Sequence, residues 1–187
     1  MRVEVLQKMP DDLIEKFYGL YMAAFEPLRT LAAARHVLTA VEFAEEMADD
    51  RVEKYVVYDA GGRAVALSTL ATDLSAVPWI EPAYFAARYP EHAARGALFY
   101  LGFTLVHPDH QGSRVFTLSI AAIIRRLTEA RAVVAYDICA HNDTVRRLGA
   151  GLERAQTAKA DVTVTTVDTQ TYYLAQYHGT RMRLSAA

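Results

Sequence analysis

Residues 105–116, LVHPDHQGSRVF, combine the features of a turn that can bind an anion. A hydrophobic segment ends at Pro108, whose nitrogen cannot donate to a sheet ladder, and a helical pattern begins a few residues later. Gly112 permits positive φ or close backbone approach, and a helix start presents N–H groups with partial positive charge. Gln111 and Ser113 would add N–H groups. The turn therefore suits a phosphate group, although many proteins with such a turn bind nothing there.

Two further residues are candidates for proton transfer. Glu81 follows Trp79 closely, and apolar surroundings can tune a carboxyl group for general acid or base chemistry. The alternative is an ordinary surface glutamate. Tyr100 lies in the hydrophobic run of residues 96–106 and offers a hydroxyl group, with core packing as its alternative role. Cys139 lies in the apolar run AVVAYDICA, which favours a buried structural thiol over a nucleophile.

The sequence gives no sign of a metal site or of a serine hydrolase. His107, His110 and His141 flank the turn without the spacing of metal ligands, and no acidic cluster accompanies them. Ser113 lacks the Gly-x-Ser-x-Gly elbow, so it is interpreted as a helix-start residue. No metal is therefore expected.

Composition limits the class of protein. The 187 residues are 52% hydrophobic and 22% charged, which predicts one folded domain over residues 1–187. A net charge of −2 makes nucleic acid an unlikely partner. A single cysteine, no leader pattern and no apolar run of about 20 residues favour a cytoplasmic protein without a membrane partner.

Hydrophobic periodicity predicts a mixed order of strands and helices. Strands are expected in residues 1–7, 52–58, 64–72, 96–108 and 132–140, with DAGG as the turn of a hairpin. Helices are expected in residues 10–25, 39–50, 113–131 and 142–155, and two terminal strands in residues 160–167 and 170–179. Residues 73–95 carry three prolines and four aromatic residues without a strand pattern, which indicates an insertion of about that length. A parallel strand–helix–strand crossover follows it.

This order of elements resembles the GNAT superfamily of N-acyltransferases over nearly the whole chain. The donor loop of that family runs Val-x-Pro, then Arg or Gln, Gly and an aliphatic residue; the matching residues here are Val106, Pro108, Gln111, Gly112 and Val115. Arg114 and Phe116 stand where the family has small residues. Asn142 matches an Asn that opens a helix beside the pantetheine arm, and Gly149 stands where many members have a Tyr that protonates the leaving thiolate.

The resemblance implies an α/β (α+β) fold with a mixed, mostly antiparallel, splayed sheet and helices on both faces. It implies that acyl-CoA enters where residues 103–106 and 133–140 run parallel. Main-chain groups of Leu105 and Val106 would then meet the pantetheine amides, and Gln111, Gly112, Ser113, Arg114, Val115 and Phe116 would lie at the phosphates. Arg114 could bind phosphate as a forked cation, which would also suit the single phosphate of a phosphopantetheine arm on an acyl carrier protein.

Two functions follow from the resemblance. The first is an N-acyltransferase that moves an acyl group to a small amine by direct attack, with the insertion shaping the acceptor site. The second is a non-catalytic sensor or scaffold that binds an acyl donor, because the long strand, residues 96–106, has no carboxylate and residue 149 has no side chain. Gly102 in that strand is expected to mark a β-bulge. The terminal strand of residues 170–179 could be an ordinary edge strand or a strand that pairs across a homodimer.

Overall fold

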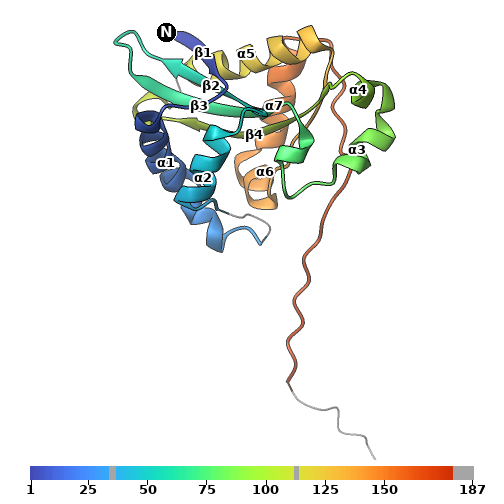
Figure 1. Cartoon of the computed structure of the whole chain (residues 1–187). Helices are drawn as coiled ribbons and strands as arrows, with labels where there is room; N and C mark the ends of the chain where they lie inside the picture. Colours follow the sequence, from blue (N-terminus) through green and yellow to red (C-terminus); the bar gives the residue numbers. More distant parts are fainter. Residues whose placement is uncertain (34–36, 112–113, 179–187) are drawn as a thin grey trace, which may run out of the picture.

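The computed structural model describes residues 1–33, 37–111 and 114–178 (Figure 1). In these ranges a sheet runs in the order β1-β2-β3-β4-β5. The strands are β1 (Arg2–Leu6), β2 (Val52–Tyr58), β3 (Ala64–Ala71), β4 (Leu98–Val106) and β5 (Val133–Ala135). The first four are antiparallel to their neighbours, and β5 runs parallel to β4.

Helices cover both faces of this sheet, as the sequence predicts. The α-helices are α1 (Asp11–Phe25), α2 (Ala40–Ala48), α3 (Pro82–Arg88), α4 (Pro90–Ala94), α5 (Arg114–Ala130), α6 (Ala140–Arg146) and α7 (Leu148–Thr157). Short 3₁₀ turns are η1 (Glu26–Thr30), η2 (Leu74–Ala76) and η3 (Pro108–His110). Helices α1 and α2 pack on one face and α5 on the other (Figure 1). No helix of the described ranges is long and apolar enough to cross a bilayer.

Local sequence signals explain where several elements begin. Asp11 and Asp12 lie in the first turn of α1, where carboxylates meet the positive end of the helix dipole. Thr39 and Glu42 form a reciprocal capping box at the start of α2. Gly62, with φ of 78°, closes the predicted hairpin between β2 and β3.

The sheet is buried on both faces because its side chains alternate between two helix layers. Val56 of β2 packs in one cluster with Phe17 of α1 and Phe43 of α2. Its neighbour Tyr55 packs with Ile123 against α5. Every residue of β3 is buried, including the polar residues Ser68 and Thr69.

One buried charge interrupts this core. Lys54 is 0% exposed, and its Nζ donates to the main-chain oxygens of Gln7, at 2.7 Å, and Asp49, at 2.5 Å. Burial lowers the pKa of Lys54 to about 8. The amine thus joins the end of β1 to the chain between α2 and β2.

The structure departs from the sequence predictions in the second half of the chain. Strand β5 ends at Ala135, before the predicted boundary at residue 140. The predicted helix of residues 142–155 is two helices, because Arg147 adopts the left-handed conformation at φ of 54°. Neither predicted terminal strand forms within residues 160–178, and the expected turn at residues 168–170 has no glycine to adopt positive φ.

The segment of residues 73–95 contains η2, α3 and α4 between β3 and β4. Its apolar side chains, among them Ile80, Phe85 and Tyr89, pack on Leu98 and Tyr100 of β4. The segment thus lies against the half of β4 that pairs with β5.

Candidate functional site

The sheet opens between β4 and β5. Their ladder consists of three pairs, from Leu98 opposite Val133 to Tyr100 opposite Ala135. Strand β4 continues to Val106, paired with β3 alone, while the other chain leaves the sheet. Main-chain groups along residues 101–106 on this edge of β4 have no β5 partner, so a ligand with amide groups can pair with them. The predicted parallel pair and its separation are confirmed, but the pairing involves residues 98–100 and 133–135 rather than residues 103–106.

A β-bulge lies just beyond the last pair. Ser68 stands opposite Thr104 and Leu70 opposite Leu101, so two residues of β4 face the single residue Thr69. One of the two is Gly102, and a Cβ atom there would lie 2.2 Å from Thr69 Oγ1. Glycine is therefore required for this close approach, and the predicted bulge is confirmed.

Three side chains from distant parts of the chain meet at the mouth of this opening. Tyr100 is 3% exposed, and its hydroxyl accepts a hydrogen bond of 2.9 Å from Trp79 Nε1 and donates to Asp137 Oδ1. The rings of Trp79 and Tyr100 lie edge to face at 6.0 Å. Trp79 and Asp137 are exposed, so an indole and a carboxylate line the surface there.

Asp137 is the residue that the sequence analysis missed. It lies in the run AVVAYDICA, directly after β5, and is the one charged residue of that run. A lone carboxylate in an apolar segment next to the predicted sheet opening was the available signal. Strand β4 contains no carboxylate, and Asp137 is a carboxylate on the β5 side of the opening.

Glu81 has a different position. Its Oε1 accepts a hydrogen bond of 3.1 Å from the N–H of Ala83, so the side chain caps α3. This is a local contact that a helix N-terminus favours. In the same segment Trp79, and not Glu81, forms a hydrogen bond with Tyr100. Glu81 forms the capping contact with Ala83 instead.

The predicted donor residues before and after the turn that follows β4 differ in their exposure. Val115 is 0% exposed, whereas Arg114 and Phe116 at the start of α5 are exposed. Leu105 is buried beneath α1 and α2, and Val106 is half-buried. Gly112 and Ser113 lie outside the described residues.

Gln111 differs from expectation in one respect. Its N–H, expected to meet a phosphate, donates to the oxygen of Pro108 at 3.1 Å because residues 108–110 form a 3₁₀ turn. An anion at the start of α5 would therefore meet the first turn of that helix and the guanidinium of Arg114.

Asn142 does not cap a helix as expected. Cys139 occupies the N-cap of α6, and Asn142 lies one turn inside, because the helix begins at Ala140. Its Oδ1 is buried and accepts no hydrogen bond in the described structure. A buried amide oxygen without a donor costs about 1–3 kcal/mol, so a ligand N–H would be favoured beside it.

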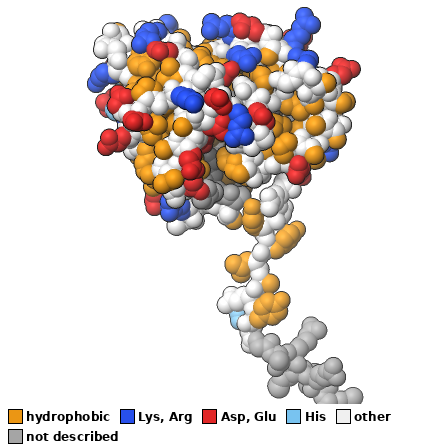
Figure 2. All heavy atoms as spheres, viewed as in Figure 1, with side chains coloured by type: hydrophobic (Ala, Val, Ile, Leu, Met, Phe, Trp, Pro, Cys, Tyr) orange, Lys and Arg blue, Asp and Glu red, His pale blue; other side chains and the backbone are white. Residues whose placement is uncertain are grey.

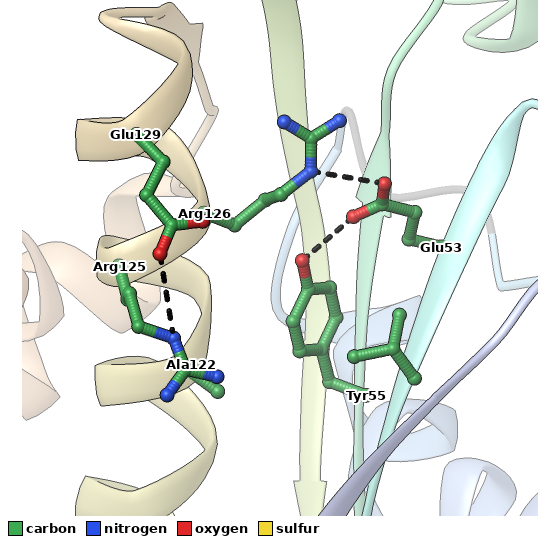
Figure 3. A pocket seen from close by; sticks show the side chains of 7 residues that line it. Glu53, Tyr55, Ala122, Arg125, Arg126 and Glu129 are labelled. Carbon is green, nitrogen blue, oxygen red and sulfur yellow. Dashed lines mark hydrogen bonds and ion pairs between the residues drawn. The ribbon is translucent and has the colours of Figure 1, made fainter.

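A separate cavity of about 170 Å³ lies between β2 and α5 (Figure 3). Glu53 is 7% exposed there and accepts hydrogen bonds from Tyr55 Oη at 2.6 Å and Arg126 Nε at 3.1 Å. Burial, and then the hydrogen bond to Glu53, raise the pKa of Tyr55. Arg126 also lies over the ring of Phe99 at 5.1 Å. Through these contacts Arg126 links α5 to strands β2 and β4 of the sheet.

Glu53→Ala is therefore expected to lower the free energy of unfolding by about 2 kcal/mol, because it leaves the buried hydroxyl of Tyr55 without its acceptor. Chemical denaturation followed by circular dichroism measures this. Glu129→Ala is the matched control: its partner Arg125 lies 3.9 Å away on the exposed side of α5, so stability should change little. An equal loss of unfolding free energy in the two variants would contradict the role of Glu53 in linking α5 to the sheet.

Within residues 1–33, 37–111 and 114–178, no three or more His, Cys, Asp or Glu residues are grouped so that they could hold a metal ion. The side chains described at the opening are the carboxylate of Asp137, the phenol of Tyr100 and the indole of Trp79.

No protein-family model matches the sequence, and no curated protein has significant sequence similarity to it. Solved structures do match. A point mutant of the BH1408 protein from Bacillus halodurans gives a TM-score of 0.52 at 13% identity, over 92% of this chain and 100% of that chain. Ribosomal-protein-alanine N-acetyltransferase from Brucella melitensis biovar Abortus 2308 gives 0.51 at 14% identity, over 91% and 100%.

An aminoglycoside acetyltransferase, meta-AAC0020, from an uncultured soil metagenomic sample, in complex with trehalose, gives a TM-score of 0.50 at 14% identity, over 91% of this chain and 96% of that chain. Identities this low bear on the fold alone. The match spans each of these proteins almost completely. The chain therefore has the fold of the GNAT N-acyltransferases.

Proposed function

We propose that the protein is an N-acyltransferase that moves an acyl group from acyl-CoA to a small amine. The observation that carries the proposal is the position of Asp137, an exposed carboxylate bonded to Tyr100 where β4 and β5 separate. A donor thioester in the opening would lie beside this carboxylate. Asp137 is thus a carboxylate beside the last β4–β5 pair that can accept a proton.

The donor side of the proposal rests on unused polar groups. The edge of β4 beyond Tyr100 lacks a strand partner, and Asn142 Oδ1 lacks a donor. The amide groups of a pantetheine arm supply both donors and acceptors for these positions. Arg114 at the start of α5 would meet a phosphate, whether it belongs to CoA or to a carrier-borne phosphopantetheine.

The reaction proposed is direct attack. An ammonium group of the acceptor binds at Asp137, loses one proton to that carboxylate, and attacks the thioester carbonyl carbon. The C–S bond then breaks, a second proton passes from nitrogen to the departing sulfur, and an amide and a free thiol result. Main-chain N–H groups at the bulge beside Gly102 would stabilise the tetrahedral oxyanion. The proton on Asp137 finally returns to solvent.

A small cationic amine suits the acceptor side. Trp79 offers an exposed aromatic face beside the carboxylate of Asp137, and a cation is attracted by both. Two N-acetyltransferases of this fold act, by their names, on an aminoglycoside and on a ribosomal protein, so the fold itself does not choose the acceptor.

Turnover on an amine library tests the proposal. The full chain is mixed with acetyl-CoA and each amine, free thiol is followed by a chromogenic reagent, and the acylated product is identified by mass spectrometry. Thiol release that depends on the amine is expected. Donor binding by calorimetry without turnover for any amine would instead favour the sensor or scaffold, and no binding at all would overturn both.

Asn142→Ala is expected to weaken CoA binding about fivefold to tenfold, the loss of one ligand hydrogen bond. Stability should stay constant or rise slightly, since the variant removes a buried oxygen that has no partner. Calorimetry and thermal unfolding measure the two quantities. Thr144→Ala, at an exposed residue two positions further along α6, is the control for the helix itself. Unchanged CoA affinity in Asn142→Ala would remove this residue from the donor site.

A further inference from the structure

The cavity of about 170 Å³ beside α5 lies at the β1–β2 side of the sheet, whereas the opening lies between β4 and β5 (Figure 3). Its floor is formed by Val5 and Tyr55, which stand opposite each other in the ladder and therefore share a face of the sheet. Tyr55 packs against α5, but Val5 is 47% exposed. The helix thus leaves the β1 end of this face uncovered, and the cavity is open there.

Arg126 presents an ordered guanidinium to this cavity. Its Nε donates to Glu53 Oε1 at 3.1 Å, and its guanidinium lies over the ring of Phe99 at 5.1 Å. Both Nη nitrogens point away from Glu53 (Figure 3), and within residues 1–33, 37–111 and 114–178 they donate to no acceptor. The side chain is 38% exposed, so a ligand can reach these nitrogens. Two parallel N–H donors of a guanidinium match the two oxygens of a carboxylate.

A cation and an anion stand together at the rim of the cavity. Arg125 Nε and Glu129 Oε1 are 3.9 Å apart, which is too far for a hydrogen bond, and the side chains are 74% and 66% exposed. Neither side chain has a hydrogen bond to another residue of the described ranges. An ammonium group that approaches Glu129 therefore finds a carboxylate that is not yet hydrogen-bonded.

The charges around the cavity cancel. Its lining contains two guanidiniums and two carboxylates, from Arg125, Arg126, Glu53 and Glu129. Figure 2 shows basic and acidic side chains interspersed at the top of the molecule, where Figure 1 places α5. A simple ion would be attracted by one group and repelled by its neighbour. A ligand that carries both charges is attracted at two points.

We propose that this cavity binds a small zwitterionic α-amino acid with an apolar side chain. The carboxylate of the ligand binds the Nη nitrogens of Arg126. Its ammonium group binds Glu129 and replaces the loose contact with Arg125. Its side chain lies on the apolar surface of Val5 and Ala122. The volume is below the roughly 300–1,000 Å³ of sites for drug-sized ligands, so the ligand is small.

Calorimetry of the full chain with L-valine and two analogues tests the site. L-Valinamide keeps the ammonium group but has no carboxylate, and isovalerate keeps the carboxylate but has no ammonium group. L-Valine is expected to bind at least tenfold more tightly than either analogue, because each analogue lacks one charge-assisted hydrogen bond. L-Alanine and L-leucine extend the range of side-chain size. Absence of binding by all three amino acids would overturn the proposal.

Two variants remove one recognition element each. Glu129→Gln should bind L-valine and isovalerate about equally, because the ammonium group no longer meets a charge. Arg126→Lys keeps a cation beside Glu53 but loses the two parallel donors, so it should bind L-valine and L-valinamide about equally. Each comparison is a ratio within one protein, and circular dichroism shows that the protein is folded. Parental ratios in both variants would contradict the assignment.

The matched controls make the same chemical changes at exposed residues outside the cavity. Glu15→Gln lies on α1, and Arg63→Lys lies between β2 and β3 with a side chain that is 70% exposed. Both controls should keep the parental ratios. A loss of discrimination in the controls equal to that in Glu129→Gln and Arg126→Lys would remove the cavity as its cause.

An amino acid is also an amine, so its binding at the opening has to be distinguished from binding in the cavity. Asp137→Asn should leave the affinity for L-valine unchanged, because Asp137 does not line the cavity. Loss of L-valine binding in Asp137→Asn, with parental binding in Glu129→Gln, would place the ligand at the opening and overturn the cavity site. None of these measurements depends on acyl transfer.

Discussion

Replacing Asp137 by asparagine is expected to lower kcat of amine acylation by a factor of about 10² to 10⁴, the usual contribution of a positioned general base. Asparagine keeps the shape of the side chain and an oxygen that can accept from Tyr100. It does not take a proton from the acceptor amine. The affinity for CoA should be unchanged, because the proposed donor site consists of the edge of β4 and Asn142 and does not include this carboxylate.

Steady-state kinetics with the best amine of the library, together with calorimetry of CoA binding, separates these effects. Asp50→Asn removes an exposed carboxylate between α2 and β2 and serves as the control for charge alone. Tyr100→Phe should lie between the two, since it removes the hydroxyl that donates to Asp137 but keeps the carboxylate. A kcat for Asp137→Asn within twofold of the parent would exclude this residue as the base.

Gly102→Val is expected to lower the free energy of unfolding by about 3 kcal/mol, at the upper end of the cost of overpacking a core. The Cβ would stand 2.2 Å from Thr69 Oγ1, and Thr69 is 1% exposed, so either the bulge or its neighbour has to move. CoA affinity should fall with stability because the bulge is where β4 turns toward the opening.

Gly19→Ala provides a matched control. It adds a methyl group in place of a glycine hydrogen, and outside the local backbone of α1 no atom lies within 4 Å of the new Cβ. This variant should be as stable as the parent or slightly more stable, as alanine favours a helix over glycine. Denaturation of both variants decides the matter. A Gly102→Val protein with parental stability would show that the bulge is not constrained by Thr69.

Local patterns allowed most of the fold to be predicted. The hairpin of β2 and β3 follows from alternation around a glycine turn, and α1 follows from its apolar spacing and the acidic residues at its start. These signals act within about fifteen residues of the chain. The early end of β5 and the corner at Arg147 have no such signal, because they depend on how β4 bulges and how α6 packs.

The candidate site was less predictable because its contacts join distant residues. Tyr100 was a candidate by type, yet its two partners lie 21 and 37 positions away in the sequence. Asn142 was placed near the donor by resemblance, but its buried and unpartnered oxygen is a property of packing. Sequence patterns therefore identified candidate residues by type, but they did not predict which of these side chains contact one another.

The corner between α6 and α7 has an evolutionary consequence. Gly149 N–H donates to Asp143 Oδ1 at 3.1 Å, and a Cβ at residue 149 would lie 2.6 Å from that same oxygen. Any side chain at residue 149, including the tyrosine that the resemblance to the GNAT superfamily would place there, must first displace Asp143 from its hydrogen bond. The two positions are therefore epistatic: a tyrosine at residue 149 becomes acceptable only after Asp143 has changed.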